Sequence, residues 1–238
     1  MTLPQKVART SSLDSLNQLF HSRTTAATTR FPSDVPASIA YYAGMPREGT
    51  QKAGFDGTDF TKRWLESTTW VELPFDAYDN EVFCTPEILD GTVQGFDLFG
   101  YIHTKPKRTP LYVESKNVNT TGGSQAADFI EFLANAYSVT AQHLRKHKAD
   151  PRCEFMFVTR QPFNIGNWSS HLEPSSIKTA LGKHPEKLGD QEIDDDLVKT
   201  VSDRLWLLVV HERQERLMLT GSEISLIESL LKRKVKEQ

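Results

Sequence analysis

Two runs of strand-forming residues, 95–103 and 111–117, flank a polar segment that contains two prolines. Such a pattern is typical of a β-hairpin with a long loop. Because successive side chains of a strand point to opposite faces, Glu114 and Lys116 share one face of the second strand. Symmetric pairing about the loop would place Asp97, in the first strand, across from the region of Lys116. The pattern therefore predicts two carboxylates and an ammonium within reach of one another in otherwise apolar strands.

The spacing of apolar residues predicts further elements on both sides of this hairpin. We expect helices over 11–20, 58–67, 125–147, 175–181, 197–205 and from 221 onward, and strands over 70–75, 153–159, 206–210 and 216–220. We interpret 54–61 as a turn-rich entry, 76–90 as an irregular acidic connection, and 183–196 as a charged, mobile stretch.

This order of elements predicts an α/β fold with a central mixed β-sheet flanked by helices. The length of 238 residues suits one sizeable domain with extensions, or at most two small domains. A stretch rich in Thr, Ser and Pro follows the first helix, so we expect residues 1–45 to form an N-terminal helix and linker arm. The α/β domain with its C-terminal helix would then occupy 46–238.

Composition narrows the choice of partners and compartment. A net charge of −3 provides no overall basic field, so any nucleic-acid contact must come from local patches. The only two cysteines, Cys84 and Cys153, lie far apart, which indicates a reducing compartment rather than a disulfide framework. No apolar run is long enough to span a bilayer. We therefore expect a cytoplasmic protein with no membrane partner.

The charged cluster of the hairpin requires a physical reason, because burying a charge is costly unless it is paired or binds a metal. Two carboxylates suit Mg²⁺, which leaves room for water and substrate phosphates. A neighbouring lysine can hold or deprotonate an attacking water and balance developing negative charge. The alternative is a buried ion-pair network of Asp97, Glu114 and Lys116 that has no catalytic role.

Asp97, followed seventeen positions later by Glu114-Ser115-Lys116, resembles the D…ExK signature of the PD-(D/E)XK nuclease superfamily, with Phe96 in place of the proline. The resemblance covers roughly residues 54–159 and implies a restriction-endonuclease-like fold. It further implies that Asp97 and Glu114 bind Mg²⁺, for which Mn²⁺ can substitute, and that Lys116 assists the nucleophilic water.

On this resemblance the expected function is a metal-dependent nuclease, with DNA as the favoured substrate and RNA as a weaker possibility. A restriction or phage-defence setting follows by analogy, with a homodimer or a larger defence complex as the assembly. The alternative is a catalytically inactive subunit of nuclease fold that binds nucleic acid or acts as a scaffold.

Members of the superfamily commonly add a helix glutamate to the metal site. Its usual position corresponds to Thr61, which is not acidic, so Glu66 is the nearest candidate, with Glu72 behind it. A surface glutamate is an equally good interpretation of both residues. Gln125 resembles a glutamine that lies near the site in one branch of the superfamily, which implies a contact with nucleic acid; solvation of a helix start would explain it as well.

Four basic residues are candidates for contacts with nucleic acid. Arg145, Lys146 and Lys148 close the helix over 125–147, where positive charge also complements the helix macrodipole. Arg160 follows the next strand in a polar loop that contains aromatic residues, a composition that suits contacts with bases and phosphates. The alternative in each case is an ordinary solvated surface.

Overall fold

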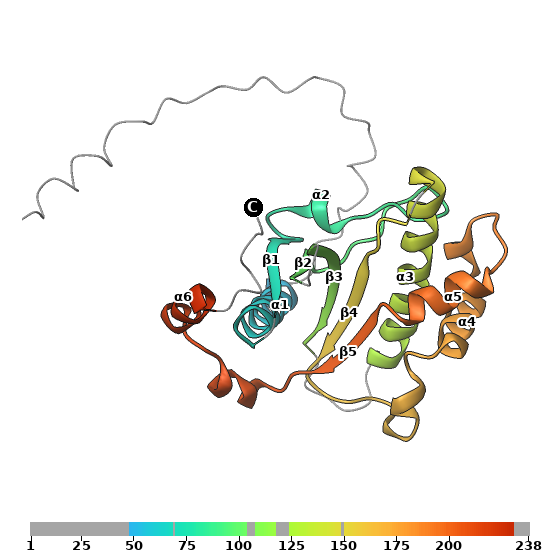
Figure 1. The fold of residues 1–238 in the computed structure, drawn as a ribbon. Helices are drawn as coiled ribbons and strands as arrows, with labels where there is room; N and C mark the ends of the chain where they lie inside the picture. Colours follow the sequence, from blue (N-terminus) through green and yellow to red (C-terminus); the bar gives the residue numbers. More distant parts are fainter. Residues whose placement is uncertain (1–47, 69, 104–107, 118–123, 149, 231–238) are drawn as a thin grey trace, which may run out of the picture. The chain divides into compact units, whose positions relative to one another are not determined.

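Five strands form one mixed sheet in the order β1-β2-β3-β4-β5 (Figure 1). In this computed structural model the described residues are 48–68, 70–103, 108–117, 124–148 and 150–230. The strands are β1 Val71–Asp76, β2 Leu98–His103, β3 Arg108–Lys116, β4 Glu154–Thr159 and β5 Leu205–Val209. The first three pair antiparallel in sequence, whereas β3, β4 and β5 are parallel neighbours. The predicted arm over 1–45 lies outside the described residues.

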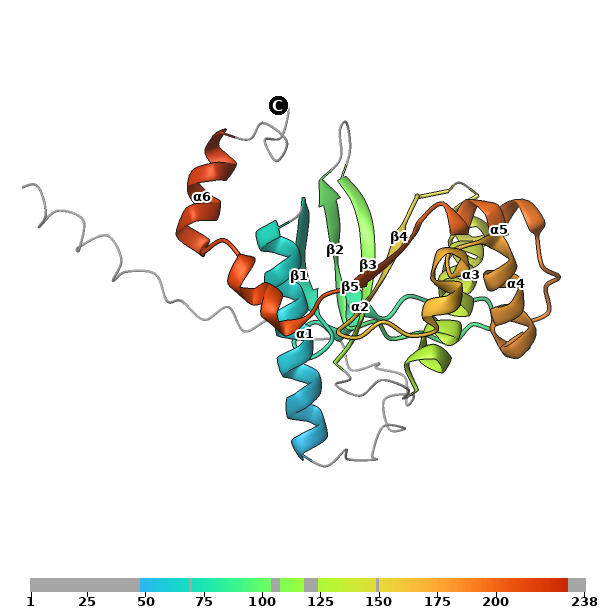
Figure 2. The same ribbon diagram turned by 90° about the horizontal axis from the view of Figure 1, so that it is seen from below.

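Helices lie on both faces of this sheet (Figures 1 and 2). The longer ones are α1 Glu48–Thr68, α3 Gln125–His147, α4 Pro174–Lys183, α5 Asp195–Ser202 and α6 Gly221–Leu230, and shorter turns are α2 Glu81–Cys84, η2 Ile165–Ser170, η3 Pro185–Leu188 and η4 Glu212–Leu217. One face packs against α1, and the other packs against α3, with α4 and α5 outside it. The expected α/β fold, a mixed sheet flanked by helices, is confirmed.

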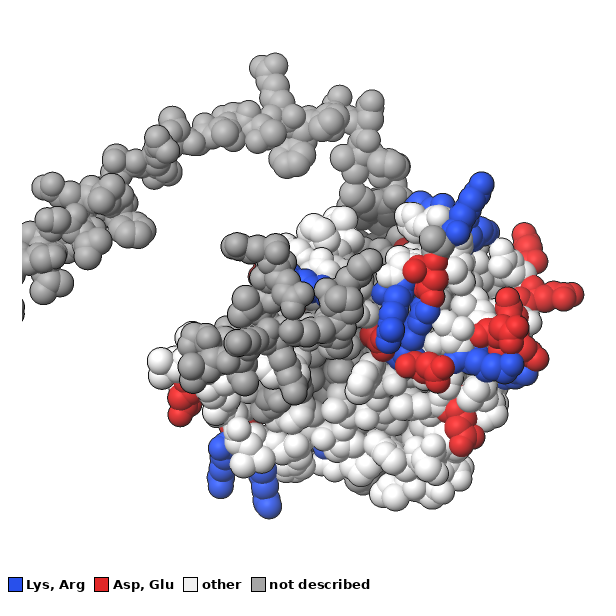
Figure 3. Space-filling view, viewed as in Figure 1, with Lys and Arg blue, Asp and Glu red and all other residues white. Residues whose placement is uncertain are grey.

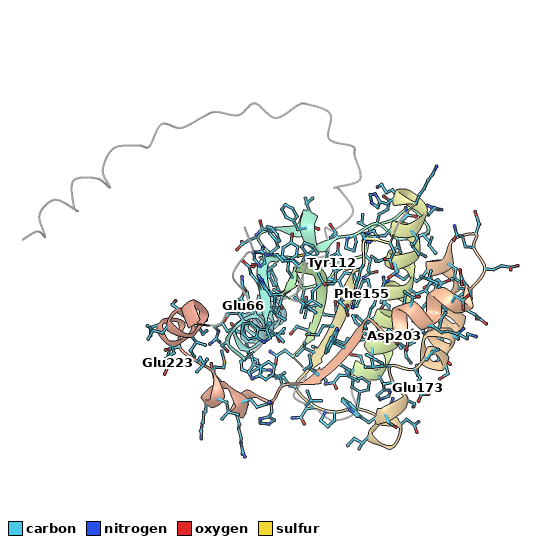
Figure 4. All side chains as sticks on the ribbon, viewed as in Figure 1. Glu66, Tyr112, Phe155, Glu173, Asp203 and Glu223 are labelled. Atoms are coloured by element: carbon cyan, nitrogen blue, oxygen red, sulfur yellow. The ribbon has the colours of Figure 1, made fainter. Side chains whose placement is uncertain are left out.

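Strand β3 is buried on both faces because its successive residues pack alternately into two hydrophobic cores, one on each side of the sheet. Leu111 and Val113 pack with Leu65 of α1, whereas Tyr112 packs with Phe155 and with aromatic residues of α3. Figure 4 shows Tyr112 and Phe155 between the sheet and α3. Glu114 continues the register of Tyr112, so its side chain belongs to the face covered by α3.

Helix α1 approaches the end of β3 very closely. A Cβ atom at Gly57 would lie 2.4 Å from the Cβ of Asn117, so only glycine permits this contact. One turn later the hydroxyls of Thr61 and Ser115 are 2.7 Å apart. These contacts fasten α1 to Ser115 and Asn117, on the face of the strand opposite to Glu114 and Lys116.

Four local predictions were wrong. Residues 54–61 belong to α1, because the glycine at position 57 serves helix–strand packing rather than a turn. The expected strand over 216–220 is not formed: residues 216 and 217 belong to η4, whose start is capped by the His211 side chain and by Gln214, and residues 218–220 are irregular. The acidic connection over 76–90 contains α2, and the charged stretch over 183–196 contains η3, where Lys187 pairs with Gln94.

Candidate active site

Asp97 lies immediately before β2 and beside the end of β3. Leu98 is the pairing partner of Val113, which places Asp97 next to Glu114 rather than across from Lys116 as symmetric pairing had suggested. The Asp97 Oδ2 atom accepts the backbone N–H of Ser115 at 2.7 Å. The structure therefore brings together the three residues that the sequence singled out, with a register two residues different from the expected one.

Glu114 and Lys116 form a direct ion pair on the face of β3 that α3 covers. The Lys116 Nζ atom lies 2.8 Å from the Glu114 Oε1 atom, and the two side chains are 29% and 17% exposed. The pair is therefore shielded from bulk solvent while remaining accessible from one side. This limited access suits a site that admits a small ligand and excludes most water.

Burial disfavours the charged forms of both carboxylates, and the charge of Asp97 adds to this effect at Glu114. Burial raises the pKa of Asp97. Burial, followed by the charge of Asp97, raises the pKa of Glu114 from its ordinary 4.5 to about 7. Burial lowers the pKa of Lys116, but the charges of Glu114 and Asp97 outweigh it, so the net pKa of Lys116 is raised. The lysine therefore stays protonated and pairs with Glu114.

This arrangement fits the chemistry of a divalent cation. Mg²⁺ commonly takes one or two protein carboxylates and completes its shell with water and substrate phosphate oxygens. Within the described ranges, no three His, Cys, Asp or Glu side chains converge as a metal site, so Asp97 and Glu114 form a two-carboxylate set. Burial raises the pKa of both carboxyls, and a cation held between them would favour their charged forms.

A cavity of about 190 Å³ opens beside the ion pair. Glu114 and Lys116 form one wall, and Asp128, Glu131 and Asn135 of α3 form the wall opposite. Sequence reasoning missed these three helix residues. Their positions, three and four residues apart, put them on one helix face, but only the three-dimensional packing shows that this face meets β3.

Glu66 does not complete the carboxylate set. Its Oε1 atom accepts the backbone N–H of Leu73 at 2.8 Å, and it belongs to α1, on the other face of the sheet from Tyr112 (Figure 4). Leu73 lies beside Gly100, about three residues or roughly 10 Å along β2 from Asp97. The expectation of a metal ligand at Glu66 is therefore corrected to a structural role, in which it fastens α1 to β1.

Gln125 begins α3 and is 2% exposed, so solvation of the helix start does not explain it. Its burial places it beneath the first turn, where Ser124 donates a hydrogen bond to Asp128 at 3.1 Å. A contact between Gln125 and nucleic acid stays a prediction.

The basic residues at the end of α3 lie far from the ion pair. Arg145, Lys146 and Lys148 are exposed, and Lys146 pairs with Glu87 at 2.9 Å. About seventeen residues of helix separate them from Asp128, which corresponds to roughly 25 Å. Figure 3 shows basic and acidic side chains intermixed on the face in view. These residues do not adjoin the candidate site, and their contact with nucleic acid stays a prediction.

Arg160 is closer to the site. It follows Thr159, the pairing partner of Lys116, so it lies at the same edge of the sheet. Its guanidinium lies over the ring of Phe60 at 4.9 Å and is 3.8 Å from Glu212. The Arg160 side chain is only 17% exposed, so only a small part of its guanidinium is accessible for a contact with phosphate.

Fold and site together define an α/β protein with a half-buried carboxylate pair and a lysine at one end of the central strand of a mixed sheet. No protein-family model matches the chain, and no curated protein matches it. Among the described residues, no helix combines the length and apolar character needed to cross a membrane.

Solved structures with a distant likeness include two receptors. A Cap4 SAVED/CARF-domain containing receptor of Moraxella osloensis is 12% identical, with a TM-score of 0.33, over 76% of this chain and 37% of that receptor. Its counterpart from Acinetobacter baumannii is 13% identical, with a TM-score of 0.31, over 78% and 41%. The chain thus spans well under half the length of these receptors. A likeness at this level carries no functional argument.

Proposed function

We propose that this chain is a metal-dependent nuclease that hydrolyses phosphodiester bonds, with DNA as its substrate. The convergence of Asp97, Glu114 and Lys116 beside an open cavity supports the proposal most strongly. The raised pKa of both carboxylates adds to it, because an ion-pair network optimised for stability would favour their charged forms.

In phosphodiester hydrolysis a water oxygen attacks phosphorus in line with the leaving oxygen, and the bond between phosphorus and the leaving oxygen breaks. The attacking water loses a proton, and the leaving oxygen gains one. A divalent cation held by Asp97 and Glu114 would polarise the phosphate and lower the pKa of the attacking water. Lys116 stays protonated because the surrounding carboxylates raise its pKa, so it donates hydrogen bonds and offsets negative charge rather than acting as a base. Asp97 is positioned by the N–H of Ser115, which fixes one of its oxygens and leaves the other available.

A second candidate is a binding subunit of the same fold without activity. One specific observation favours it: at the helix position where the superfamily commonly has a glutamate, Thr61 contacts Ser115 by its hydroxyl and supplies no carboxylate. Such a subunit would bind nucleic acid at the same edge of the sheet but would leave it intact.

Incubation of the purified chain with plasmid, linear DNA, single-stranded DNA and RNA, each with Mg²⁺, Mn²⁺ or excess chelator, tests the proposal. We expect DNA cleavage that depends on the metal. Undiminished cleavage in chelator would refute the metal-dependent centre. Binding without cleavage of any substrate would establish the second candidate.

A matched pair of variants separates the site from the rest of the sheet. Glu114→Gln should abolish cleavage. Glu72→Gln removes a carboxylate that pairs with His103 at 2.8 Å in the same sheet, away from the cavity, and should leave cleavage intact. Equal loss in both variants would show that cleavage depends on sheet integrity rather than on Glu114.

A further inference from the structure

The sheet formed by the described residues has two edge strands, and only β1 is protected against pairing with another chain. An open strand edge carries unpaired N–H and C=O groups, which natural proteins block with charges, proline or an irregular register. Strand β1 contains Glu72 and Pro74, and its register shifts within this stretch. The Glu66 carboxylate also accepts the N–H of Leu73. Strand β5, with the sequence LWLLV, has neither charge nor proline and pairs with β4 without a shift (Figure 1).

The backbone groups at the outer edge of β5 follow from its hydrogen bonds with β4. The N–H of Phe155 donates to the Arg204 carbonyl at 3.0 Å, and the N–H of Val210 donates to the Thr159 carbonyl at 2.8 Å. Because bonding residues alternate in a parallel pair, every second residue of β5 points both backbone groups away from β4. These outward residues are Leu205, Leu207 and Val209. Their outward groups have no hydrogen-bond partner among the described residues, so the edge is a template for one more strand.

Apolar side chains accompany this open edge. Trp206 is 47% exposed, although its Nε1 atom donates a hydrogen bond to Glu154 at 3.0 Å that fixes the ring. The next three residues, 207–209, are half-buried. A large apolar side chain that is already held in one orientation loses little conformational freedom when a partner covers it.

We infer that β5 pairs with β5 of a second copy of this chain, antiparallel about a two-fold axis at Leu207. In this register Leu207 exchanges hydrogen bonds with its own counterpart, and Leu205 does so with Val209 of the second copy. Trp206 then lies across from Leu208 of the second copy, on the face of the sheet that α1 covers. The two sheets become one continuous sheet, and the open edge of each copy is covered by the other.

The charges that flank β5 favour the same antiparallel arrangement. Asp203 precedes the strand, Arg213 follows it in η4, and both are exposed. Glu212, beside Arg213, lies 3.8 Å from Arg160 of its own copy. Antiparallel pairing brings the start of one strand to the end of the other, so Asp203 of each copy approaches the turn that carries Arg213 of the other. A parallel copy would instead bring like charges together.

Sedimentation equilibrium of the full chain over a concentration series, without substrate, tests the inference independently of the proposed nuclease. Two five-residue strands with one exposed aromatic side chain each bury less than the roughly 1,200–2,000 Å² of a stable interface. We therefore expect a monomer–dimer equilibrium with a dissociation constant in the micromolar range. A monomer at every concentration would overturn the inference.

Matched variants place the interface. Trp206→Lys should weaken the dimer at least about tenfold, because it puts a charge across from Leu208 of the second copy. Val82→Lys changes an 85% exposed apolar residue of α2, the helix that packs beside β1, and should leave the dimer intact. Asp203→Arg should also weaken the dimer, and Arg213→Asp in the same chain should restore it. Equal effects of the two lysine variants, or no restoration by the charge exchange, would overturn this pairing.

Amide hydrogen exchange of the parent chain provides a measurement that needs no variant. The N–H of Leu207 points outward and should be protected only at concentrations at which the dimer forms. The N–H of Leu208 bonds to β4 and should be protected equally at low and high concentration. Exchange at Leu207 that does not depend on concentration would overturn the inference, whether or not the chain cleaves DNA.

Discussion

Replacement of Glu114 by glutamine should stabilise the protein in the absence of metal, and increasingly so as the pH rises. The pKa of Glu114 in the folded protein is about 7, above its ordinary 4.5, because the residue is buried beside Asp97. The folded state therefore binds the proton more tightly than the unfolded state does. The favourable contribution of protonated Glu114 is complete below pH 4.5 and is lost as the pH rises through about 7. Glutamine does not titrate, so the variant avoids this loss.

The size of the effect follows from the pKa difference. A shift from 4.5 to about 7 corresponds to about 3 kcal/mol at 1.36 kcal/mol per pKa unit. Because the Glu114 side chain is 17% exposed, screening makes this an upper value. In a unit of this size, 3 kcal/mol corresponds to a rise in Tm of about 6–12 °C. At pH 4.5 the variant and the parent chain should melt within about 1 °C of each other.

Thermal melts in chelator at a series of pH values between 4.5 and 8.5 measure this difference directly. Glu72→Gln serves as the matched control, since it also removes an ion-paired carboxylate from the sheet. The reasoning fails if Glu114→Gln is destabilised by ~3–5 kcal/mol at neutral pH, the cost of breaking a buried ion pair that serves only stability.

The remaining predictions concern the lysine, the metal and the packing beneath the site. Lys116→Met should abolish DNA cleavage while Mn²⁺ still raises the Tm; retention of cleavage would remove Lys116 from the site. Stabilisation of the parent chain by Mn²⁺ should increase from pH 6 to pH 8, because protons compete for Glu114, and a pH-independent increase in Tm would contradict this. Gly57→Ala should destabilise by ~1–3 kcal/mol, since the new Cβ would lie 2.4 Å from the Cβ of Asn117, whereas Gly182→Ala, where nothing lies within 4 Å, should not destabilise; similar melts for the two would refute the close approach.

Much of the fold was predictable because the signals are local. Alternating side chains in the hairpin and the long apolar face of the helix over 125–147 depend on periodicities of two and 3.6 residues. The convergence of Asp97 with Glu114 followed from the same alternation and a hairpin connection. The register of the two strands could not be predicted in this way, because a long loop leaves their residue-by-residue pairing undetermined.

The parts that the sequence did not predict depend on contacts between distant segments. Gly57 suggests a turn until α1 is seen to lie against Asn117. Glu66 was a reasonable metal ligand by position, but its carboxylate accepts the N–H of Leu73, a contact that no motif encodes. Asp128, Glu131 and Asn135 are ordinary helix residues in the sequence, and only the packing of α3 against β3 places them around the cavity.

The most direct measurement pairs a Mn²⁺ binding isotherm with a plasmid-nicking titration on the same preparation, for the parent chain and for Asp97→Asn. If Asp97 and Glu114 hold the cation that nicking requires, half-maximal nicking and half-maximal binding should fall at the same Mn²⁺ concentration. Asp97→Asn should then shift both to higher concentration together. Nicking that persists in excess chelator, or an Asp97→Asn variant that nicks and binds Mn²⁺ like the parent chain, would contradict a metal-dependent nuclease at this site.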